Sequence, residues 1–323
     1  MRKIVCRELA SPVRLLVEEV DPPEPGPGEV VVDVAAAGVT FADALIVQGK
    51  YQIKPPVPFT PGTEIAGPIS AVGEGVDGWS VGDRVMASTG LGAFAEQVAM
   101  RAEDVLPLPP ELSFGQGASF GQSYATMMFA YAHRTTVAEG ETVLVLGAGG
   151  GIGLAAVDVG RALGARVIAA ASSEEKLAAA RAMGAEATIA YEEEDLKVRA
   201  RELGGGGVDV VVDAVGGRHA EPALRALRLG GRFLVLGFAS GTIPSLPLNQ
   251  VLLNNRTVVG VEWGGWALRN PDENRTLLLS LLGMAAAGRL HPAEPAARPL
   301  AEAGAVLADM VGRRVTGKVV LVP

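Results

Sequence analysis

The sequence predicts a two-domain α/β protein, in which a β-rich, barrel-like domain is followed by a doubly wound parallel sheet. The length of 323 residues favours two domains, because a domain has roughly 100–200 residues. The first third of the chain has short apolar runs cut by glycine and proline, whereas the middle third alternates strands with helices. An apolar fraction of 49% and a charged fraction of 20% exclude intrinsic disorder as a description of the whole chain.

The first third is predicted to form a compact β domain. A strand rich in β-branched residues is expected over Glu29–Ala36, and short apolar runs cut by glycine and proline occupy Ile65–Val72 and Arg84–Ala87. Closely spaced turn signals accompany them, at Gly73-Glu74-Gly75, Asp77-Gly78 and Gly82-Asp83. Pro22–Gly28 is too rich in proline for a helix or a central strand, so we expect a connection there.

The middle third is predicted to form parallel strands joined by right-handed helical crossovers. Buried strands are expected over Thr142–Leu146, Arg166–Ala171, Val208–Val212 and Arg232–Leu236. Helices are expected over about Gly151–Leu163 and Glu174–Met183, and a third has Pro222 in its first turn. Further along the chain, a helix over Pro271–Gly288 and a final strand over Lys318–Val322 are expected.

Charge and cysteine content limit the classes of partner and of site. A net charge of −8 disfavours nucleic acid or an anionic membrane surface as the main partner. The single cysteine, Cys6, excludes an intramolecular disulfide and a cysteine-rich zinc site. No apolar run reaches the roughly 18 residues of a membrane span, and the N-terminus has no apolar stretch of signal-peptide length. We therefore expect a cytoplasmic protein.

The most informative stretch is Val143–Gly153, which reads VLVLGAGGGIG. A buried strand, a glycine run and a helix follow one another, which is the geometry in which backbone N–H groups and a helix N-terminus bind a pyrophosphate. Gly150, Gly151 and Ile152 are therefore candidate cofactor-binding residues. Ala148 takes the place of the first glycine in the usual G-x-G-x-x-G pattern. The alternative is an ordinary glycine-rich connection between a strand and a helix.

The end of the second predicted strand indicates which dinucleotide would bind. An NAD-specific site places an acidic residue there, about 20 residues after the glycine run, for the ribose 2′-hydroxyl. This chain has Ser172, Ser173 and Lys176 at that place, and two hydroxyls with an ammonium suit a 2′-phosphate. Glu174 and Glu175 are expected on the first helical turn, where the helix dipole favours acidic residues. NADPH is favoured over NADH, with helix capping alone as the alternative role of the two serines.

Motifs elsewhere in the chain carry a family resemblance. They are Gly38-Val-Thr-Phe-Ala-Asp43, Pro61-Gly-Thr-Glu64, Val81-Gly-Asp-Arg-Val85, Asp213-Ala-Val-Gly-Gly217 and Thr316-Gly-Lys-Val-Val320. With these motifs the chain resembles, essentially end to end, the zinc-free NADPH:quinone reductases (zeta-crystallin-like) of the medium-chain dehydrogenase/reductase superfamily. The resemblance implies a chaperonin-10-like (GroES-like) catalytic domain over residues 1–122 and 265–323. It also implies a Rossmann domain over residues 123–264, and an active site in the cleft between the two domains.

The resemblance also bears on zinc. Zinc-dependent relatives carry a cysteine at the place of Thr40, a histidine at the place of Thr63 and a four-cysteine lobe, none of which this chain has. The three histidines are far apart in the sequence, at His133, His219 and His291. No metal site is therefore expected. Hydride transfer from NADPH to an electron-poor acceptor, such as a quinone carbonyl or a conjugated alkene, needs less help from a Lewis acid.

Further cofactor-binding residues are implied by the resemblance, namely Thr126, Tyr191, Val215, Phe238, Ser240 and Arg314. Tyr191 and Arg314 would join Lys176 around the 2′-phosphate, although each is also explained as a surface residue. Thr126 would lie beside the nicotinamide. The remaining three would line the cofactor cleft, which agrees with ligand binding at the carboxyl ends of parallel strands. Packing between domains is the alternative for Phe238.

The substrate end of the site has fewer signals. Many relatives carry asparagine at the place of Thr40, and some carry tyrosine at that of Leu45. We expect the Thr40 hydroxyl, and with it Tyr51, to polarise the acceptor oxygen or to position the nicotinamide ribose. The alternatives are a turn hydroxyl for Thr40 and packing for Tyr51.

Three functions remain open from the sequence. The first is a quinone reductase that transfers hydride from the nicotinamide C4, and the second is an enoyl-thioester or enone reductase on the same scaffold. The third is an NADPH-binding structural or regulatory protein with little catalysis. Relatives are commonly homodimers, paired through an edge strand that would here be Thr257–Trp263, and a homodimer is expected.

Overall fold

The computed structural model describes residues 1–10 and 14–323. The chain forms two compact units, one made of Met1–Gln122 with Ala293–Pro323 and the other of Ser123–Pro292. The first boundary agrees with the predicted end of the first domain at residue 122. The second boundary differs, because the return to the first unit was expected at residue 265 and lies at residue 293.

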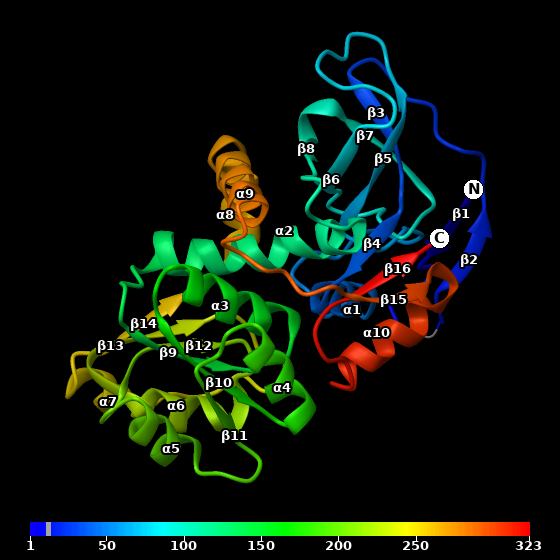
Figure 1. Cartoon of the computed structure of the whole chain (residues 1–323). Helices are drawn as coiled ribbons and strands as arrows, with labels where there is room; N and C mark the ends of the chain where they lie inside the picture. Colours follow the sequence, from blue (N-terminus) through cyan, green and yellow to red (C-terminus); the bar gives the residue numbers. More distant parts are fainter. Residues whose placement is uncertain (11–13) are drawn as a thin grey trace. The chain divides into compact units, whose positions relative to one another are not determined.

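The first unit is built mainly from antiparallel strands (Figure 1). Its strands are β1 (Arg2–Val5), β2 (Leu16–Glu19), β3 (Glu29–Asp33), β4 (Ala36–Val39), β5 (Glu64–Val72), β6 (Arg84–Ser88), β7 (Gln97–Arg101), β8 (Val105–Pro107), β15 (Ala296–Pro299) and β16 (Val319–Val322). Eight of them form one sheet in the order β15-β16-β4-β5-β3-β7, with β6 on β5 and β8 on β6. The expected strand over Glu29–Ala36 is therefore wrong at its end, because Asp33 closes β3 and Ala36 opens β4, which pairs with the opposite edge of the shared neighbour β5.

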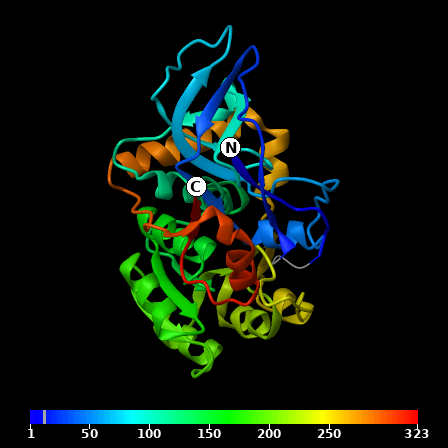
Figure 2. The same ribbon diagram turned by 90° about the vertical axis from the view of Figure 1, so that its right-hand side faces the viewer.

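The last segment of the chain completes the sheet of the first unit (Figure 2). Strand β16 pairs with β4, and β4 pairs with β5 on its other side. This register sets Val319 opposite Val39 and Gly38 opposite Glu64. The end of β4 therefore lies beside the starts of β5 and β16, which are far apart in the sequence. Helices α1 (Phe41–Val47) and α10 (Ala303–Val311) pack on each other beside this place.

The second unit is a parallel sheet covered on both faces by helices (Figure 1). The strands are β9 (Thr142–Leu146), β10 (Arg166–Ala171), β11 (Ala187–Ala190), β12 (Val208–Asp213), β13 (Leu227–Val235) and β14 (Thr257–Gly260). Their order, β11-β10-β9-β12-β13-β14, is that of the doubly wound dinucleotide-binding fold. The predicted strands over 142–146 and 166–171 are confirmed at both ends.

The helices of the second unit follow from its crossovers. They are α3 (Gly151–Ala162), α4 (Glu174–Ala182), α5 (Leu196–Leu203), α6 (Ala220–Ala226), α7 (Leu248–Leu252), α8 (Trp263–Arg269) and α9 (Pro271–Ala286). Helices α3 and α4 pack together, α3 over β9 and β10 and α4 over β10 and β11, whereas α5 and α6 pack together, α5 against β10 and β11 and α6 against β12 and β13. Leu144, Ile168 and Phe233 belong to the apolar core that the sheet shares with α5 and α6.

Helices α8 and α9 pack within the second unit, which explains the shift of the predicted boundary. The ring centroids of Phe129 and Trp266 lie 4.8 Å apart, and the backbone N–H of His291 donates to Asp158 Oδ2 at 2.7 Å. Phe129 opens a π-helical turn, Phe129–Arg134, that continues α2 (Phe114–Met128). The predicted edge strand also ends early, at Gly260, because Glu262 accepts a hydrogen bond from the Gly265 N–H and caps α8. In the part of the chain that the structure describes, no helix is long and apolar enough to cross a membrane.

Candidate active site

The glycine run connects the carboxyl end of β9 to the start of α3. Gly150 is the N-cap of α3, and no side chain caps the helix start. The first turn of α3 carries no acidic residue. Because the N-terminus of a helix carries partial positive charge on its unpaired N–H groups, this end is suited to an anion.

The glycines of this run are required for different reasons. A Cβ atom at Gly153 would overlap Gly147 O and would lie 2.6 Å from Ala148 Cα, so glycine is needed for the turn itself to close. At Gly150 the nearest atom to such a Cβ would be Gly147 O, at 3.5 Å, which is ordinary contact. Nothing within the chain therefore requires glycine at position 150. The space beside Gly150 is a cradle that a phosphate group of a ligand would fill, which fits a bound dinucleotide.

The turn between β10 and α4 lies against the glycine run. A Cβ atom at Gly149 would overlap the Lys176 side chain, so Lys176 packs directly on the glycine turn. Ser173 is the N-cap of α4 and accepts from the Lys176 N–H at 3.5 Å, whereas Ser172 is exposed just after β10. The expected place of Glu174 in the first helical turn is confirmed, and this carboxylate pairs with Arg181. No carboxylate occupies the end of β10 itself.

The turn after β12 brings three further predicted residues to the same end of the sheet. A Cβ atom at Gly147 would lie 2.8 Å from Val215 Cγ2, so Val215 borders the glycine run. Phe238 and Ser240 border the turn on its other side, at Gly216 and Gly217, where the corresponding distances are 3.0 Å to Phe238 Cδ1 and 2.7 Å to Ser240 Oγ. Both of these glycines have positive φ, of 66° and 60°.

Asp213 holds this turn in place, and it was not among the predicted site residues. Its Oδ1 accepts from the backbone N–H groups of Val215 and Gly216, both at 2.8 Å. Burial raises the pKa of the carboxyl, and these two hydrogen bonds lower it in part. A lone carboxylate at the end of a buried strand, followed by two glycines, was the available signal.

Tyr191 follows β11 and lies next to the serine pair, because Ala190 pairs with Ala171 at the ends of the two strands. Its ring lies 4.2 Å from that of His219, centroid to centroid, which the sequence did not suggest. Thr126 is half-buried on α2 in the same unit, outside this group of contacts. Arg314 belongs to the first unit, where it pairs with Asp309 at 2.7 Å.

The substrate-end residues both lie in the first unit. Thr40 is only 4% exposed and is the N-cap of α1, in a reciprocal capping box with Asp43. Its hydroxyl donates to Asp43 Oδ2 at 2.7 Å, and its own N–H donates to the same oxygen at 2.8 Å. The hydroxyl thus caps α1, a role that neither interpretation of the sequence named. Tyr51 is half-buried after α1.

A buried acidic pair stands behind Thr40. Asp43 is completely buried, and burial raises the pKa of its carboxyl to about 7. Glu64 is 4% exposed, and its pKa is also raised by burial. Its Oε1 accepts from the Gln122 N–H at 2.6 Å, and its Oε2 lies 3.9 Å from Lys318 Nζ. The sequence analysis missed all of this, although the spacing of Thr40 and Asp43, which is that of a capping box, was an available signal.

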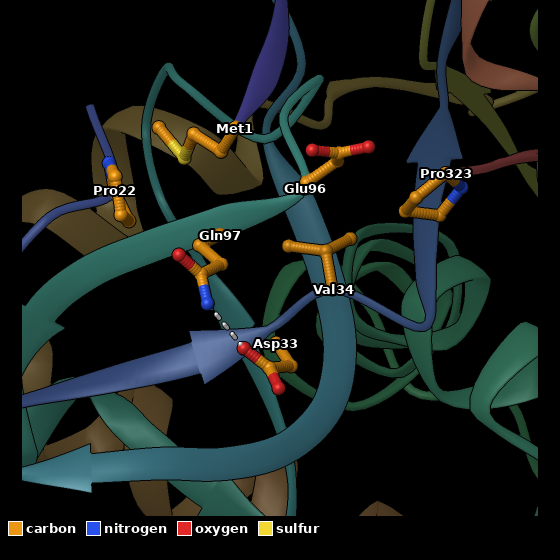
Figure 3. Close-up of a pocket in the computed structure, with 7 residues that line it drawn as sticks. All are labelled: Met1, Pro22, Asp33, Val34, Glu96, Gln97 and Pro323. Carbon is orange, nitrogen blue, oxygen red and sulfur yellow. Dashed lines mark hydrogen bonds between the residues drawn. The ribbon is translucent and has the colours of Figure 1, made fainter. Parts of the chain in front are cut away.

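A surface pocket of about 400 Å³ also lies in the first unit, near both chain ends (Figure 3). It is lined by Met1, Pro22, Asp33, Val34, Glu96, Gln97 and Pro323. Gln97 Nε2 donates to Asp33 Oδ1 at 2.7 Å and fixes one wall. None of the lining residues is a predicted site residue, and the pocket carries no catalytic group.

Among residues 1–10 and 14–323, no three histidine, cysteine, aspartate or glutamate side chains gather in a way that could hold a metal ion. His133 stacks on Phe129, with centroids 5.7 Å apart, and His219 lies against Tyr191.

A GroES-like unit combined with a doubly wound parallel sheet of this order defines the medium-chain dehydrogenase/reductase superfamily of oxidoreductases. Family models agree: residues 26–110 match the alcohol dehydrogenase GroES-like domain, and residues 151–282 match a model described as zinc-binding dehydrogenase.

Individual relatives are more specific. The chain is 39% identical over 322 residues to quinone oxidoreductase-like protein 2 of Bos taurus, covering 99% of this chain and 92% of that one. The structure of Escherichia coli quinone oxidoreductase complexed with NADPH is 30% identical, covers all of both chains and gives a TM-score of 0.88. A structure described as an NAD-dependent alcohol dehydrogenase is 31% identical over both whole chains, with a TM-score of 0.90. The chain belongs to the quinone oxidoreductase family of the superfamily.

Proposed function

We propose that the protein is an NADPH-dependent quinone oxidoreductase that transfers hydride from the nicotinamide C4 to a quinone without zinc. The observation that carries the proposal is the cradle above Gly150, at an uncapped helix N-terminus that Lys176 borders. A pyrophosphate fits there, and the two serines with Lys176 supply donors for a 2′-phosphate. The NADPH in the Escherichia coli relative supports the same cofactor.

The zinc-free state is part of the proposal and is supported by residue chemistry. Thr40 and Thr63 stand where zinc-dependent relatives carry ligands, and hydroxyls are poor ligands for zinc beside cysteine and histidine. A quinone is already electron-poor, so hydride transfer does not require the polarisation that a metal gives. Metal analysis of the purified chain, with activity measured before and after a chelator, tests this part directly.

The test of the main proposal is a steady-state panel that follows the oxidation of NADPH. Quinones are compared with enones and enoyl-CoA thioesters, at equal cofactor concentration. Quinones are expected to give the highest kcat/KM. Higher values for the enoyl compounds would replace the proposal by the double-bond reductase. Tight NADPH binding with no turnover of any acceptor would replace it by a binding protein.

Assembly into a homodimer is a further part of the proposal. Strand β14 ends the sheet of the second unit, and Val258 on it is 41% exposed. Nearby in the sequence, Leu248, Leu252 and Leu253 are each more than 70% exposed. An open apolar strand edge favours pairing with another copy. Light scattering on the full chain should give the dimer mass, and Val258→Lys should lower it to that of the monomer.

A further inference from the structure

The buried acidic pair of the first unit lies at the meeting point of three strand ends. Thr40 follows β4, Glu64 opens β5 and Lys318 precedes β16, and β4 lies between the other two in the sheet. The capping box then adds Asp43 from the first turn of α1. Two carboxyl groups and one ammonium are thus enclosed together. With both carboxyls ionised the group would carry one uncompensated negative charge, which burial disfavours.

Hydrogen bonding within this group is incomplete. Asp43 Oδ1 and Glu64 Oε2 are buried and have no hydrogen-bond partner among the described residues. Asp43 Oδ2, by contrast, accepts from both the Thr40 N–H and the Thr40 hydroxyl. An unpaired buried carboxylate oxygen is unfavourable, whereas a neutral carboxyl has less need of partners. The geometry therefore favours one proton held on the pair.

We propose that Asp43 is a buried proton donor that acts on the substrate through the Thr40 hydroxyl, which rests on the reductase function proposed above. When Asp43 is ionised, Oδ2 accepts the hydroxyl hydrogen of Thr40 and turns it away from any substrate. When Oδ2 carries a proton, it donates to Thr40 Oγ1, and the Thr40 hydrogen is released for a substrate oxygen. Asp43 is thus a positioning residue, and Thr40 is the group that touches the substrate.

The proton balance of the step is complete. A bound NADPH would supply hydride, which would bring two electrons to the acceptor and leave an oxyanion on it. Thr40 gives its hydroxyl proton to that oxyanion while Oδ2 of Asp43 gives its proton to Thr40 Oγ1. The reduced acceptor leaves as a neutral hydroxyl compound, Asp43 remains as a carboxylate, and a proton taken up from solvent restores the neutral carboxyl before the next turnover.

The charged groups around Asp43 are few. Glu64 raises the pKa of Asp43 by repulsion, and Lys318 lowers it by attraction. Helix α1 carries no other titratable residue, and Asp309 is the one on α10, where it pairs with Arg314. Gln122 is the neighbour on α2, and it is neutral. The pKa of Asp43 is therefore set first by burial, which raises it, then by the two hydrogen bonds from Thr40, which lower it, and then by Glu64 and Lys318.

The experiment is a titration of the full chain by NMR with ¹³C-labelled aspartate side chains, assigned with Asp43→Asn. A midpoint near 7 is expected for Asp43. Glu64→Gln should lower this midpoint because it removes a repulsion, and Thr40→Val should raise it because it removes a hydrogen bond to the ionised form. A midpoint below about 5, the ordinary range of an aspartate, would overturn the proposal. So would a midpoint that Thr40→Val leaves unchanged.

The kinetic arm separates the proposal from a purely structural role. Wild-type kcat/KM should fall about tenfold per pH unit above the Asp43 midpoint, because the donor must be protonated. In Asp43→Asn, kcat/KM should be about 100-fold lower at pH 6 and should no longer fall as the pH rises above the Asp43 midpoint. Glu64→Gln should keep this fall in kcat/KM and move it to lower pH. Thr40→Ser should restore most of the kcat/KM that Thr40→Val loses.

The two proposals fail in distinguishable ways. Turnover of quinones with a flat pH profile in the wild type would overturn the role of Asp43 and leave the reductase function standing. Absence of turnover with every acceptor would overturn the reductase function, and with it the donor role, whatever the NMR midpoint.

Discussion

The glycine turn of the second unit and the buried acidic pair of the first unit prepare for chemistry in opposite ways. The turn exposes backbone N–H groups by omitting side chains, so its chemistry follows from the side chain that is absent at Gly150. In the acidic pair two carboxyl groups are buried, and one oxygen of each lacks a hydrogen-bond partner among the described residues. The chemistry of the pair therefore follows from burial. A backbone site depends on local sequence, whereas the protonation of a buried pair depends on the topology that surrounds it.

The largest expected effect tests the division of roles within the glycine turn. Gly153→Val should destabilise the chain by about 4 kcal/mol or more, because even its Cβ would overlap Gly147 O. Gly150→Ala should leave the free energy of unfolding within about 1 kcal/mol, since its Cβ finds room at φ −92°. It should nevertheless weaken NADPH binding at least tenfold. Denaturant unfolding and calorimetric titration measure the two quantities.

Equal NADPH affinity in Gly150→Ala and the wild type would contradict the proposal that a phosphate of the cofactor fills the space beside Gly150. Gly153→Ala is the size-matched partner of Gly150→Ala, because the two substitutions then differ only in whether the chain or the ligand fills the space.

The next effect sharpens the contrast with the acidic pair. The folded pKa of Asp43 is about 7, above the unfolded value, so the folded state binds the extra proton. The contribution of Asp43 to stability is therefore present at low pH and is lost as the pH rises through about 7. From pH 5 to pH 8 the loss is about 3 kcal/mol. Asp43→Asn should remove this dependence, so its free energy of unfolding relative to wild type should increase between these pH values.

Chemical denaturation at the two pH values measures this difference. Glu64→Gln is the control, because it should reduce the dependence without abolishing it. A stability difference between Asp43→Asn and wild type that does not change with pH would show that Asp43 is ionised throughout.

The contrast also explains what the sequence could predict. Strands β9 and β10, the glycine turn and Lys176 were predicted because apolar runs and glycines act locally. The acidic pair was missed, because Asp43, Glu64 and Lys318 meet only through the pairing of β4 with β5 and β16. Helix α1 was missed too, because it is one short element among strands. The predicted boundary at residue 265 differs from the end of the second compact unit at Pro292, because a pattern of apolar residues does not show that Trp266 packs on Phe129.

A smaller effect concerns the reading of the 2′-phosphate. Lys176→Ala should weaken NADPH binding by about 2 kcal/mol, the range for loss of a charged hydrogen bond, and should spare NADH. Lys197→Ala is the matched control, because it removes one exposed ammonium from α5 of the same unit. Titration with both cofactors measures the change. Equal losses for NADPH and NADH would show that Lys176 supports the turn rather than the phosphate.

The smallest effect distinguishes the two serines. Ser173 caps α4 over a long 3.5 Å hydrogen bond, so Ser173→Ala should lower the free energy of unfolding by only about 0.5 kcal/mol. Ser172 makes no cap, so Ser172→Ala should leave stability unchanged and weaken NADPH binding alone. If Ser173→Ala lowered NADPH affinity at constant stability, the capping role would be secondary to phosphate binding. The serine pair would then resemble Gly150, at which the ligand rather than the fold determines the residue.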